Sequence, residues 1–253
     1  MSSYLITGTT RGLGLTLTRQ LLEMPASQVG KVIVLNRREP TPPLQELINK
    51  YSGRLFPVTA AVADTESVNK AAEEVKSILG SQGLDVLVNN AGFQAFSENG
   101  VLGMTEEQLT SSLDINVTGP HRVIVAFLPL LRAGKEKKII NITSSMGSNG
   151  WAWFTKHAPS PAYKIAKAAM NMLNTQYAMY LQDEGFTCLL ISPGWMRTDL
   201  GGPNADLDVE EGTLGTKNVI LNATKAENGK FLNIHVPGKE ESFGRYDGKE
   251  VPY

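Results

Sequence analysis

The chain has 253 residues, of which 42% are hydrophobic and 19% are charged, a composition that is typical of globular proteins and excludes a disordered chain. Its 24 basic and 25 acidic residues leave a formal net charge of −1, so no bulk charge favours binding to nucleic acid or to a membrane surface. No apolar stretch approaches the roughly 18 residues that span a bilayer, and the N-terminus lacks the features of a signal peptide. We therefore expect a soluble cytoplasmic protein.

Short β-branched runs alternate with longer amphipathic stretches, which predicts a parallel sheet covered by helices on both faces. The expected strands are apolar on both sides, as buried strands must be: Tyr4–Ile6, Lys31–Asn36, Leu55–Thr59, Val86–Asn89, Lys138–Ile142, Thr187–Ser192 and Lys230–Asn233. The expected helices are Leu13–Leu22, Thr65–Leu79, Thr105–Leu131 with breaks at Pro120 and Pro129, and Ser160–Glu184. No linker or repeat divides the chain, so we expect one α/β domain over residues 1–253, a doubly wound sheet of seven parallel strands.

Two stretches fit neither pattern, Met146–Pro159 and Gly194–Asp208. Long irregular segments inside a compact domain are usually functional or mobile. We therefore expect a substrate loop around residues 194–208.

The cysteine and histidine content predicts no metal site. Cys188 is the only cysteine, which excludes an intrachain disulfide and a zinc site built from several cysteines. It lies in the apolar run Cys188–Ile191, which favours a buried structural thiol over a nucleophile. The three histidines are scattered along the chain and suggest no metal ligands.

A glycine-rich turn follows the first expected strand. Its glycines, spaced Gly-x-x-x-Gly-x-Gly, permit a tight turn and the close approach of a pyrophosphate, and the helix that follows offers unpaired N–H groups to the anion. A plain strand-to-helix connection is the alternative, but the position after the first strand of a βαβ unit favours a dinucleotide site. The candidate cofactor-binding residues in this turn are Gly8, Thr10, Arg11, Gly12, Leu13 and Gly14.

The end of the second expected strand indicates which dinucleotide binds. An acidic residue there would bind the ribose 2′-hydroxyl of NAD, but this chain has Asn36-Arg37-Arg38. Guanidinium groups bind phosphate in a bidentate manner, so the sequence predicts NADPH or NADP as the cofactor, with Arg37 as a ligand of its 2′-phosphate and Arg11 within reach of the same group. The alternative, solvated loop charges, applies more to Arg38 than to Arg37.

Tyr163 and Lys167 lie four residues apart at the start of the expected helix Ser160–Glu184, on one helical face. A free phenol has a pKa near 10, and a neighbouring ammonium lowers this pKa, so that the tyrosine can act as a general acid or base. On spacing alone, this pair is better explained by chance, because Tyr-x-x-x-Lys occurs by chance in many helices.

The combination of motifs is more specific than any one of them. The motifs are Thr7-Gly8-x3-Gly12-Leu13-Gly14, Asn89-Asn90-Ala91-Gly92, Asn116, Ser144-Ser145, Tyr163-x3-Lys167 and Pro193-Gly194. In this order, and over almost the whole chain, they resemble the short-chain dehydrogenase/reductase family. The stretches Ser192–Gly202 and Tyr246–Gly248 look like its carbonyl-reductase branch, which includes the C-factor and Sniffer proteins. The resemblance implies a Rossmann fold and an NADP-dependent oxidoreductase that reduces ketones or aldehydes.

The same resemblance implies four catalytic residues. Tyr163 matches the tyrosine that gives a proton to the carbonyl oxygen, and Lys167 matches the lysine that binds the nicotinamide ribose and lowers the tyrosine pKa. Ser145, the second serine of its pair, matches the serine that binds the substrate oxygen. Asn116 matches the asparagine that supports a water-mediated proton relay. We therefore expect an active enzyme.

Further cofactor contacts follow from the family pattern. Asn90, Ala91 and Gly92 resemble the turn beside the adenosine, and the residues that resemble the nicotinamide segment are Pro193, Gly194, Met196 and Thr198. Ala61 stands where family members usually carry an adenine-binding aspartate, so the adenine contacts are left open.

The interval between Ser145 and Tyr163 is longer than usual in the family, with an aromatic insertion around residues 149–157. We expect Trp151, Trp153 and Phe154 to border the substrate pocket and to favour bulky or aromatic carbonyl compounds. A subunit interface or core packing is the alternative. The family resemblance also favours a homo-oligomer, a dimer or tetramer.

Three functions are therefore compared: an NADPH-dependent carbonyl reductase in small-molecule metabolism, an NADPH-binding regulator, and a redox-neutral isomerase or cyclase. The four catalytic matches argue against the regulator, which needs none of them. The sequence does not reveal the substrate.

Overall fold

The computed structural model describes all residues, 1–253, and contains one parallel sheet in the order β3-β2-β1-β4-β5-β6-β7. The strands are β1 (Ser2–Thr7), β2 (Val29–Asn36), β3 (Leu55–Thr59), β4 (Val86–Asn89), β5 (Lys138–Ile142), β6 (Thr187–Ser192) and β7 (Phe231–Asn233). All seven expected strands are confirmed, with shifts of a few residues at their ends. The strand order reverses between β1 and β4, and in open α/β sheets such a switch point places the ligand crevice at the carboxyl ends of the strands.

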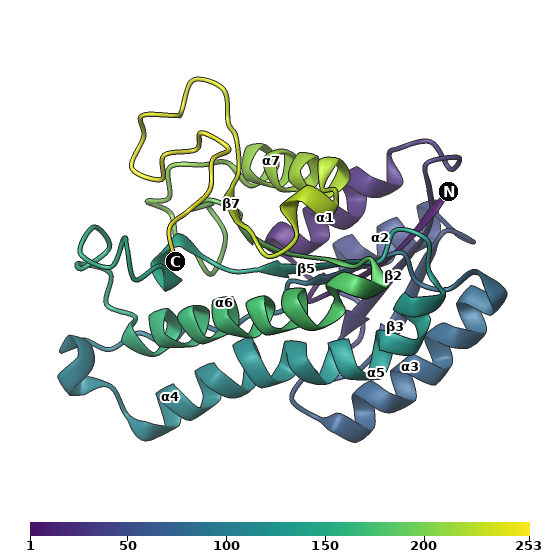
Figure 1. Cartoon of the computed structure of the whole chain (residues 1–253), viewed down its shortest axis with the longest axis horizontal. Helices are drawn as coiled ribbons and strands as arrows, with labels where there is room; N and C mark the ends of the chain where they lie inside the picture. The colour runs from purple at the N-terminus through teal and green to yellow at the C-terminus, as the bar shows by residue number, and fades with distance from the viewer.

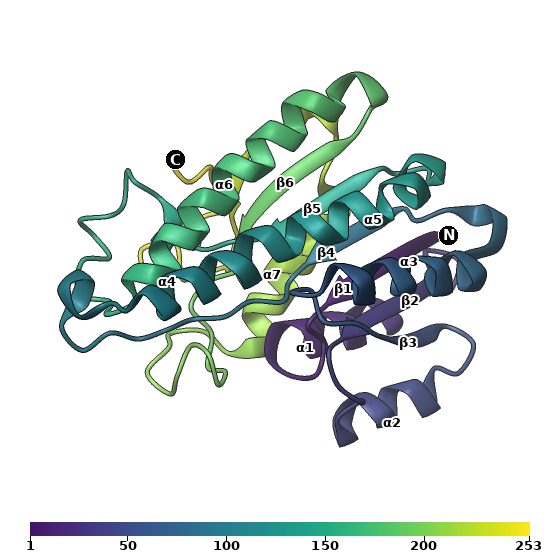
Figure 2. The ribbon, with the colours of Figure 1, turned by 90° about the horizontal axis from the view of Figure 1, so that it is seen from below.

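Helices cover both faces of the sheet (Figures 1 and 2). They are α1 (Gly12–Leu22), α2 (Pro42–Lys50), α3 (Thr65–Leu79), α4 (Glu106–Leu113), α5 (Gly119–Ala133), α6 (Pro161–Leu181) and α7 (Val209–Asn222). One apolar cluster lies beneath α1, α2 and α7, and a second lies beneath α3, α5 and α6. This two-sided burial explains why the strands are apolar on both sides, and it confirms the doubly wound fold.

The expected helix Thr105–Leu131 is interrupted at a different place from the one predicted. A five-residue π-turn, Asp114–Thr118, separates α4 from α5, and Pro120 lies in the first turn of α5. The predicted break at Pro129 is wrong, because α5 continues through it to Ala133. The carbonyl that Pro129 leaves without a helical donor belongs to Val125, whose side chain is exposed, so water can satisfy it.

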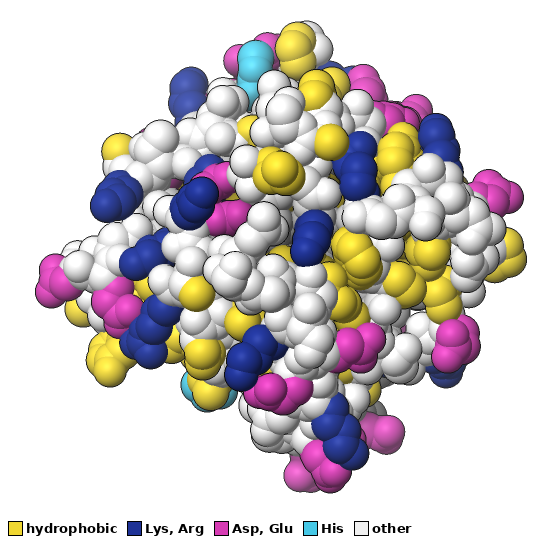
Figure 3. All heavy atoms as spheres, turned by 90° about the vertical axis from the view of Figure 1, so that its right-hand side faces the viewer, with side chains coloured by type: hydrophobic (Ala, Val, Ile, Leu, Met, Phe, Trp, Pro, Cys, Tyr) yellow, Lys and Arg dark blue, Asp and Glu magenta, His cyan; other side chains and the backbone are white.

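Charges of both signs are mixed over the face seen in Figure 3, in keeping with a net charge of −1. No helix has the length and apolar character needed to cross a membrane.

Candidate active site

The predicted site residues gather at the carboxyl edge of the sheet, on the left in Figures 1 and 2. The glycine turn follows β1, Asn90–Gly92 follow β4, Ser144 and Ser145 follow β5, and the segment 194–208 follows β6. Parallel strands bring these connections together although they lie far apart in the sequence.

The backbone of the glycine turn is fixed by the side chain of Asn90, which directly follows β4. The Asn90 amide donates to the carbonyl oxygens of Thr7 and Gly8, at 2.8 Å each. A Cβ atom at Gly14 would overlap the Gly8 carbonyl and come within 2.5 Å of the Asn90 amide nitrogen, so only glycine fits there. No side chain caps the first turn of α1, which leaves its N–H groups available to an anion. The turn therefore fits a dinucleotide pyrophosphate.

The end of β2 presents two free guanidinium groups beside this turn. Buried Asn36 accepts a hydrogen bond from the Thr9 N–H at 2.7 Å and donates to the Thr9 hydroxyl at 2.9 Å, which joins β2 to the turn. Arg37 and Arg38 are exposed and form no ion pair within the chain. Arg11, in contrast, pairs with Asp199 at 2.7 Å. The two arginines after β2 are therefore the better placed to bind a phosphate.

The adenine side of the site remains without an acidic ligand. Asp64, three residues after Ala61, accepts a hydrogen bond from the Ser67 N–H at 2.9 Å and so caps α3. Its carboxylate is therefore used to cap the N-terminus of α3.

Tyr163 and Lys167 occupy the first two turns of α6 and are 7% and 4% exposed. The Lys167 Nζ lies 5.5 Å from the centroid of the Tyr163 ring and donates to the Ile142 carbonyl oxygen at 2.8 Å. Burial lowers the pKa of Lys167 to about 8. Burial also raises the pKa of Tyr163 to about 12, although a hydrogen bond from Ser144 works in the opposite direction. In the protein alone, the phenol is thus held in its neutral, proton-donating form.

Ser144, rather than Ser145, is the serine that contacts Tyr163, whereas the sequence led us to expect Ser145 as the catalytic serine. The Ser144 hydroxyl bonds the Tyr163 phenol, whereas the hydrogen bond of Ser145 runs from its backbone N–H to the Ser192 hydroxyl at 3.2 Å. The reason is local. Ser144 keeps the extended backbone of the strand that precedes it, with φ −157° and ψ 145°, whereas the backbone turns at Ser145, where a 3₁₀ turn begins.

Asn116 lies in the π-turn and is fully buried. Its amide donates to the Phe93 carbonyl at 2.8 Å and to the Ser112 carbonyl at 2.9 Å, and its Oδ1 accepts from the Phe93 N–H at 3.2 Å. A Cβ atom at Gly92 would lie 3.2 Å from this Oδ1 and 4.0 Å from the Lys167 Nζ. The fold thus brings Asn116, Gly92 and Lys167 around one small space.

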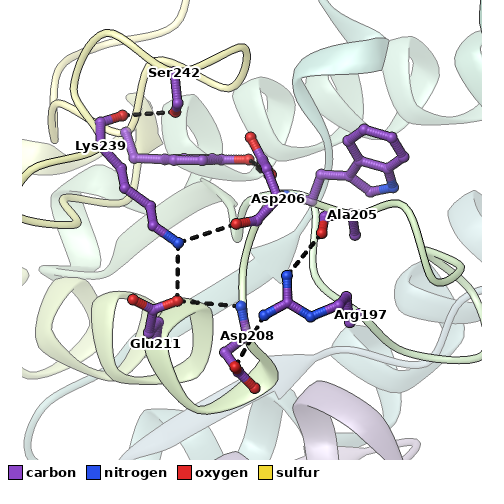
Figure 4. Close-up of polar contacts among 9 residues, drawn as sticks. Arg197, Ala205, Asp206, Asp208, Glu211, Lys239 and Ser242 are labelled. Atoms are coloured by element: carbon purple, nitrogen blue, oxygen red, sulfur yellow. Dashed lines mark hydrogen bonds and ion pairs between the residues drawn. The ribbon is translucent and has the colours of Figure 1, made fainter.

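The segment 194–208 is tied to the C-terminal region through polar contacts (Figure 4). The Trp195 N–H donates to the Tyr246 hydroxyl at 3.1 Å, and this hydroxyl donates to Asp206 at 2.6 Å. Lys239 donates to the Asp206 carbonyl oxygen and to Glu211, at 3.0 Å each. These contacts fix a long loop that would otherwise cost conformational entropy to order.

The predicted nicotinamide residues of this segment point in different directions. The Met196 side chain is buried and packs against α7 at Gly212, so only its backbone is left for a cofactor. Thr198 lies against the glycine turn, where its methyl group would be 3.4 Å from a Cβ at Gly12.

An aromatic cluster that the sequence reveals only in part lies at the same edge of the sheet. The rings of Phe154 and Phe243 stack with centroids 4.6 Å apart, and Trp195 meets Phe243 edge-on at 6.3 Å. The Arg245 guanidinium lies 5.5 Å from the Phe154 ring and 5.7 Å from that of Trp151. Trp151 also packs against an inner apolar cluster, and Trp153 is 86% exposed.

Two known proteins are similar to this chain in sequence. The chain is 37% identical over 212 residues to the short-chain dehydrogenase/reductase atnB of Arthrinium sp, covering 79% of this chain and 76% of that one. It is 34% identical over 176 residues to the C-signal protein of Myxococcus xanthus, covering 67% and 93%.

Two solved structures are similar over the whole chain. The NADPH-bound carbonyl reductase from chicken fatty liver has a TM-score of 0.86 and 29% identity, covering 100% of this chain and 94% of that one. The carbonyl reductase Sniffer of D. melanogaster has a TM-score of 0.87 and 28% identity, covering 100% of both. Residues 3–207 match the short chain dehydrogenase family. The chain therefore belongs to the short-chain dehydrogenase/reductase family of oxidoreductases.

Proposed function

We propose that the protein is an NADPH-dependent reductase that converts a ketone or an aldehyde to an alcohol. The observation that carries this proposal is the position of Tyr163, buried beside Lys167 and bonded by Ser144, at the edge of the sheet that holds an uncapped helix N-terminus. The similarity to a carbonyl reductase that binds NADPH supports the choice of cofactor.

NADPH, when bound, supplies the hydride. In the proposed mechanism, the hydroxyls of Tyr163 and Ser144 bind the carbonyl oxygen of the substrate, and Tyr163 donates its proton to that oxygen as negative charge develops there. Lys167 binds ribose hydroxyls and stabilises the phenolate that is left. Asn116 keeps the space near Lys167 open to a water molecule, through which the proton is replaced.

The preference for NADPH over NADH rests on Arg37. Its guanidinium is exposed and without an acidic partner, beside the turn that fits the pyrophosphate. A 2′-phosphate at this place accepts charge-assisted hydrogen bonds from the Arg37 guanidinium. NADH lacks this phosphate and cannot form them. We place Gly8, Thr10, Gly12, Leu13 and Gly14 along the pyrophosphate, and the remaining proposed cofactor contacts are Asn90, Ala91, Gly92, Pro193, Gly194, Thr198 and the backbone of Met196.

For the substrate, we propose a bulky or aromatic carbonyl compound. Half-exposed Phe154, Trp195 and Phe243 offer ring faces at the carboxyl edge of the sheet, where ligands bind in this class of fold. The test is Phe154→Ala, with Trp153→Ala as the control, because Trp153 stands apart in solvent. We expect only the first variant to lower kcat/KM for a polycyclic ketone, with little change for a small aliphatic aldehyde; an equal loss for both compounds would make the cluster structural.

The experiment that tests the function follows NADPH oxidation with a panel of carbonyl compounds and purified protein. The proposal expects one NADPH consumed for each alcohol formed. A regulator would bind NADPH without turnover, and an isomerase or cyclase would convert its substrate with no net consumption of NADPH.

The proposal includes a homo-oligomer and a cytoplasmic location. On α6, Ile165, Met172 and Met179 are exposed at seven-residue spacing, whereas Met170 is buried in the core. A stripe of apolar side chains on one helical face supports contact with a second copy. Light scattering of the purified protein tests this point.

A further inference from the structure

Asn171 lies one helical turn beyond Lys167 on α6, is 2% exposed and uses its whole side chain to bond a single segment of the chain. Its Oδ1 accepts a hydrogen bond from the Thr143 hydroxyl at 2.7 Å, and its Nδ2 donates to the Gly147 carbonyl oxygen at 3.2 Å. Thr143 and Gly147 are the two ends of the five-residue segment that contains Ser144. One amide thus fixes both ends of this segment to the helix.

The fit between this segment and α6 is close on the catalytic side as well. A Cβ atom at Gly147 would come within 2.7 Å of the Lys167 backbone, so the turn packs directly on the helix that carries the tyrosine and the lysine. Lys167 itself reaches back to the Ile142 carbonyl oxygen, at the end of β5. The position of the Ser144 hydroxyl relative to the phenol therefore depends on how the segment is held against α6.

We propose that Asn171 is a positioning residue for the reduction: it sets the place of the Ser144 hydroxyl relative to Tyr163 without touching substrate or cofactor. This inference rests on the proposed function, since it concerns the same proton transfer. Asn171 is buried, so its amide has no access to the site, and both its hydrogen bonds are used to hold the segment. A displacement of about 1 Å at a reacting group lowers the rate by about 100-fold.

The chain offers a matched control on the next turn of the same helix. Asn174 is also buried, and its amide bonds Asn141 at 2.8 Å and the Cys188 carbonyl oxygen at 3.3 Å. It has the same side chain, the same helix and two hydrogen bonds to the sheet, but none to the Ser144 segment. Asn171→Leu and Asn174→Leu therefore remove similar polar contacts from similar surroundings.

The experiment compares the two variants with the wild type by melting temperature, kcat, KM for NADPH and the pH profile of kcat. We expect similar losses of melting temperature in both, but a fall in kcat of about 10- to 100-fold only in Asn171→Leu, with KM for NADPH within about twofold of the wild type. Because the hydrogen bond from Ser144 lowers the Tyr163 pKa, its loss should also move the basic limb of the pH profile to higher pH in Asn171→Leu alone.

A milder pair of variants repeats the test if Asn171→Leu does not fold. Thr143→Val deletes the hydroxyl that bonds Asn171 and should lower kcat, whereas Thr143→Ser keeps it and should restore kcat. Equal falls of kcat in Asn171→Leu and Asn174→Leu, or an unchanged kcat in Thr143→Val, would overturn the inference. A wild-type protein that reduces no carbonyl compound would instead overturn the proposed function, so the two failures are distinct.

Discussion

Replacing Lys167 with methionine should make the cofactor-free protein more stable while it abolishes catalysis. The ammonium is buried, and its pKa falls from 10.5 to about 8, which corresponds to about 3 kcal/mol of destabilisation at pH 7. The variant also loses the hydrogen bond to the Ile142 carbonyl, at a cost of about 1 kcal/mol. The net gain of about 2 kcal/mol should raise the melting temperature by about 4–8 °C in a chain of this size.

The pH dependence makes this prediction specific. Between about pH 8 and 10.5 the unfolded chain still holds a proton that the folded chain has released, so the wild type becomes more stable relative to the variant as the pH rises. The advantage of Lys167→Met should therefore be constant below pH 8, shrink as the pH rises, and reverse by about pH 10.5, where only the loss of the hydrogen bond, about 1 kcal/mol, remains. Thermal unfolding in calorimetry or circular dichroism, without cofactor, measures it.

Lys164 provides the control, because it also donates to a backbone carbonyl, that of Thr155 at 2.7 Å, but is only partly buried. Burial lowers the pKa of Lys164 as well, but its ammonium is only partly removed from water, so Lys164→Met should gain less stability than Lys167→Met. If Lys167→Met melts below the wild type at pH 7, or if the difference does not change up to pH 10.5, the reasoning about the buried ammonium is refuted.

Three further predictions concern the cofactor and the serine pair. Arg37→Asp should raise KM for NADPH by about 10- to 150-fold and leave KM for NADH unchanged, because one charge-assisted contact to phosphate contributes about 1.5–3 kcal/mol. Equal kcat/KM for the two cofactors in the wild type would contradict this prediction. Gly14→Ala should fold, but its affinity for NADPH in calorimetric titration should fall at least about 10-fold, because the new methyl group displaces the glycine turn. An unchanged affinity would show that the turn does not hold the cofactor. Ser144→Ala should lower kcat by about 100-fold or more, whereas Ser145→Ala should keep most of the activity; the reverse order would restore the residue expected from the sequence.

The sheet could be predicted because its signal is local. Each strand is a short, largely apolar run, and all but the edge strand β3 are mostly buried on both faces. The structure places all seven where these runs lie. Two helices were not foreseen. α2 begins at Pro42-Pro43, a pair typical of loops, and α7 contains Gly212 and Gly215, which have low helix propensity. The glycines let α7 approach Met196 and Ile234 closely, so tertiary packing outweighs propensity there.

Prediction of the site residues from the sequence succeeds where the signal is local and fails where it is not. Tyr163 and Lys167 lie one turn apart on a helix, and spacing alone places them together. The choice between Ser144 and Ser145 depends on where a strand ends and a 3₁₀ turn begins, which adjacent identical residues do not reveal. The stacking of Phe154 on Phe243 joins segments almost ninety positions apart, and no periodicity connects them.

The most direct test of the central claim is a hydride-transfer measurement with NADPH deuterated at its transferable position. With an aromatic aldehyde or ketone, the account predicts deuterium on the carbinol carbon of the product, one NADPH consumed for each alcohol, and a fall of at least about 100-fold in turnover for Tyr163→Phe with NADPH affinity retained. Bound NADPH without transfer of the label to any carbonyl compound, or substantial turnover in Tyr163→Phe, would contradict it.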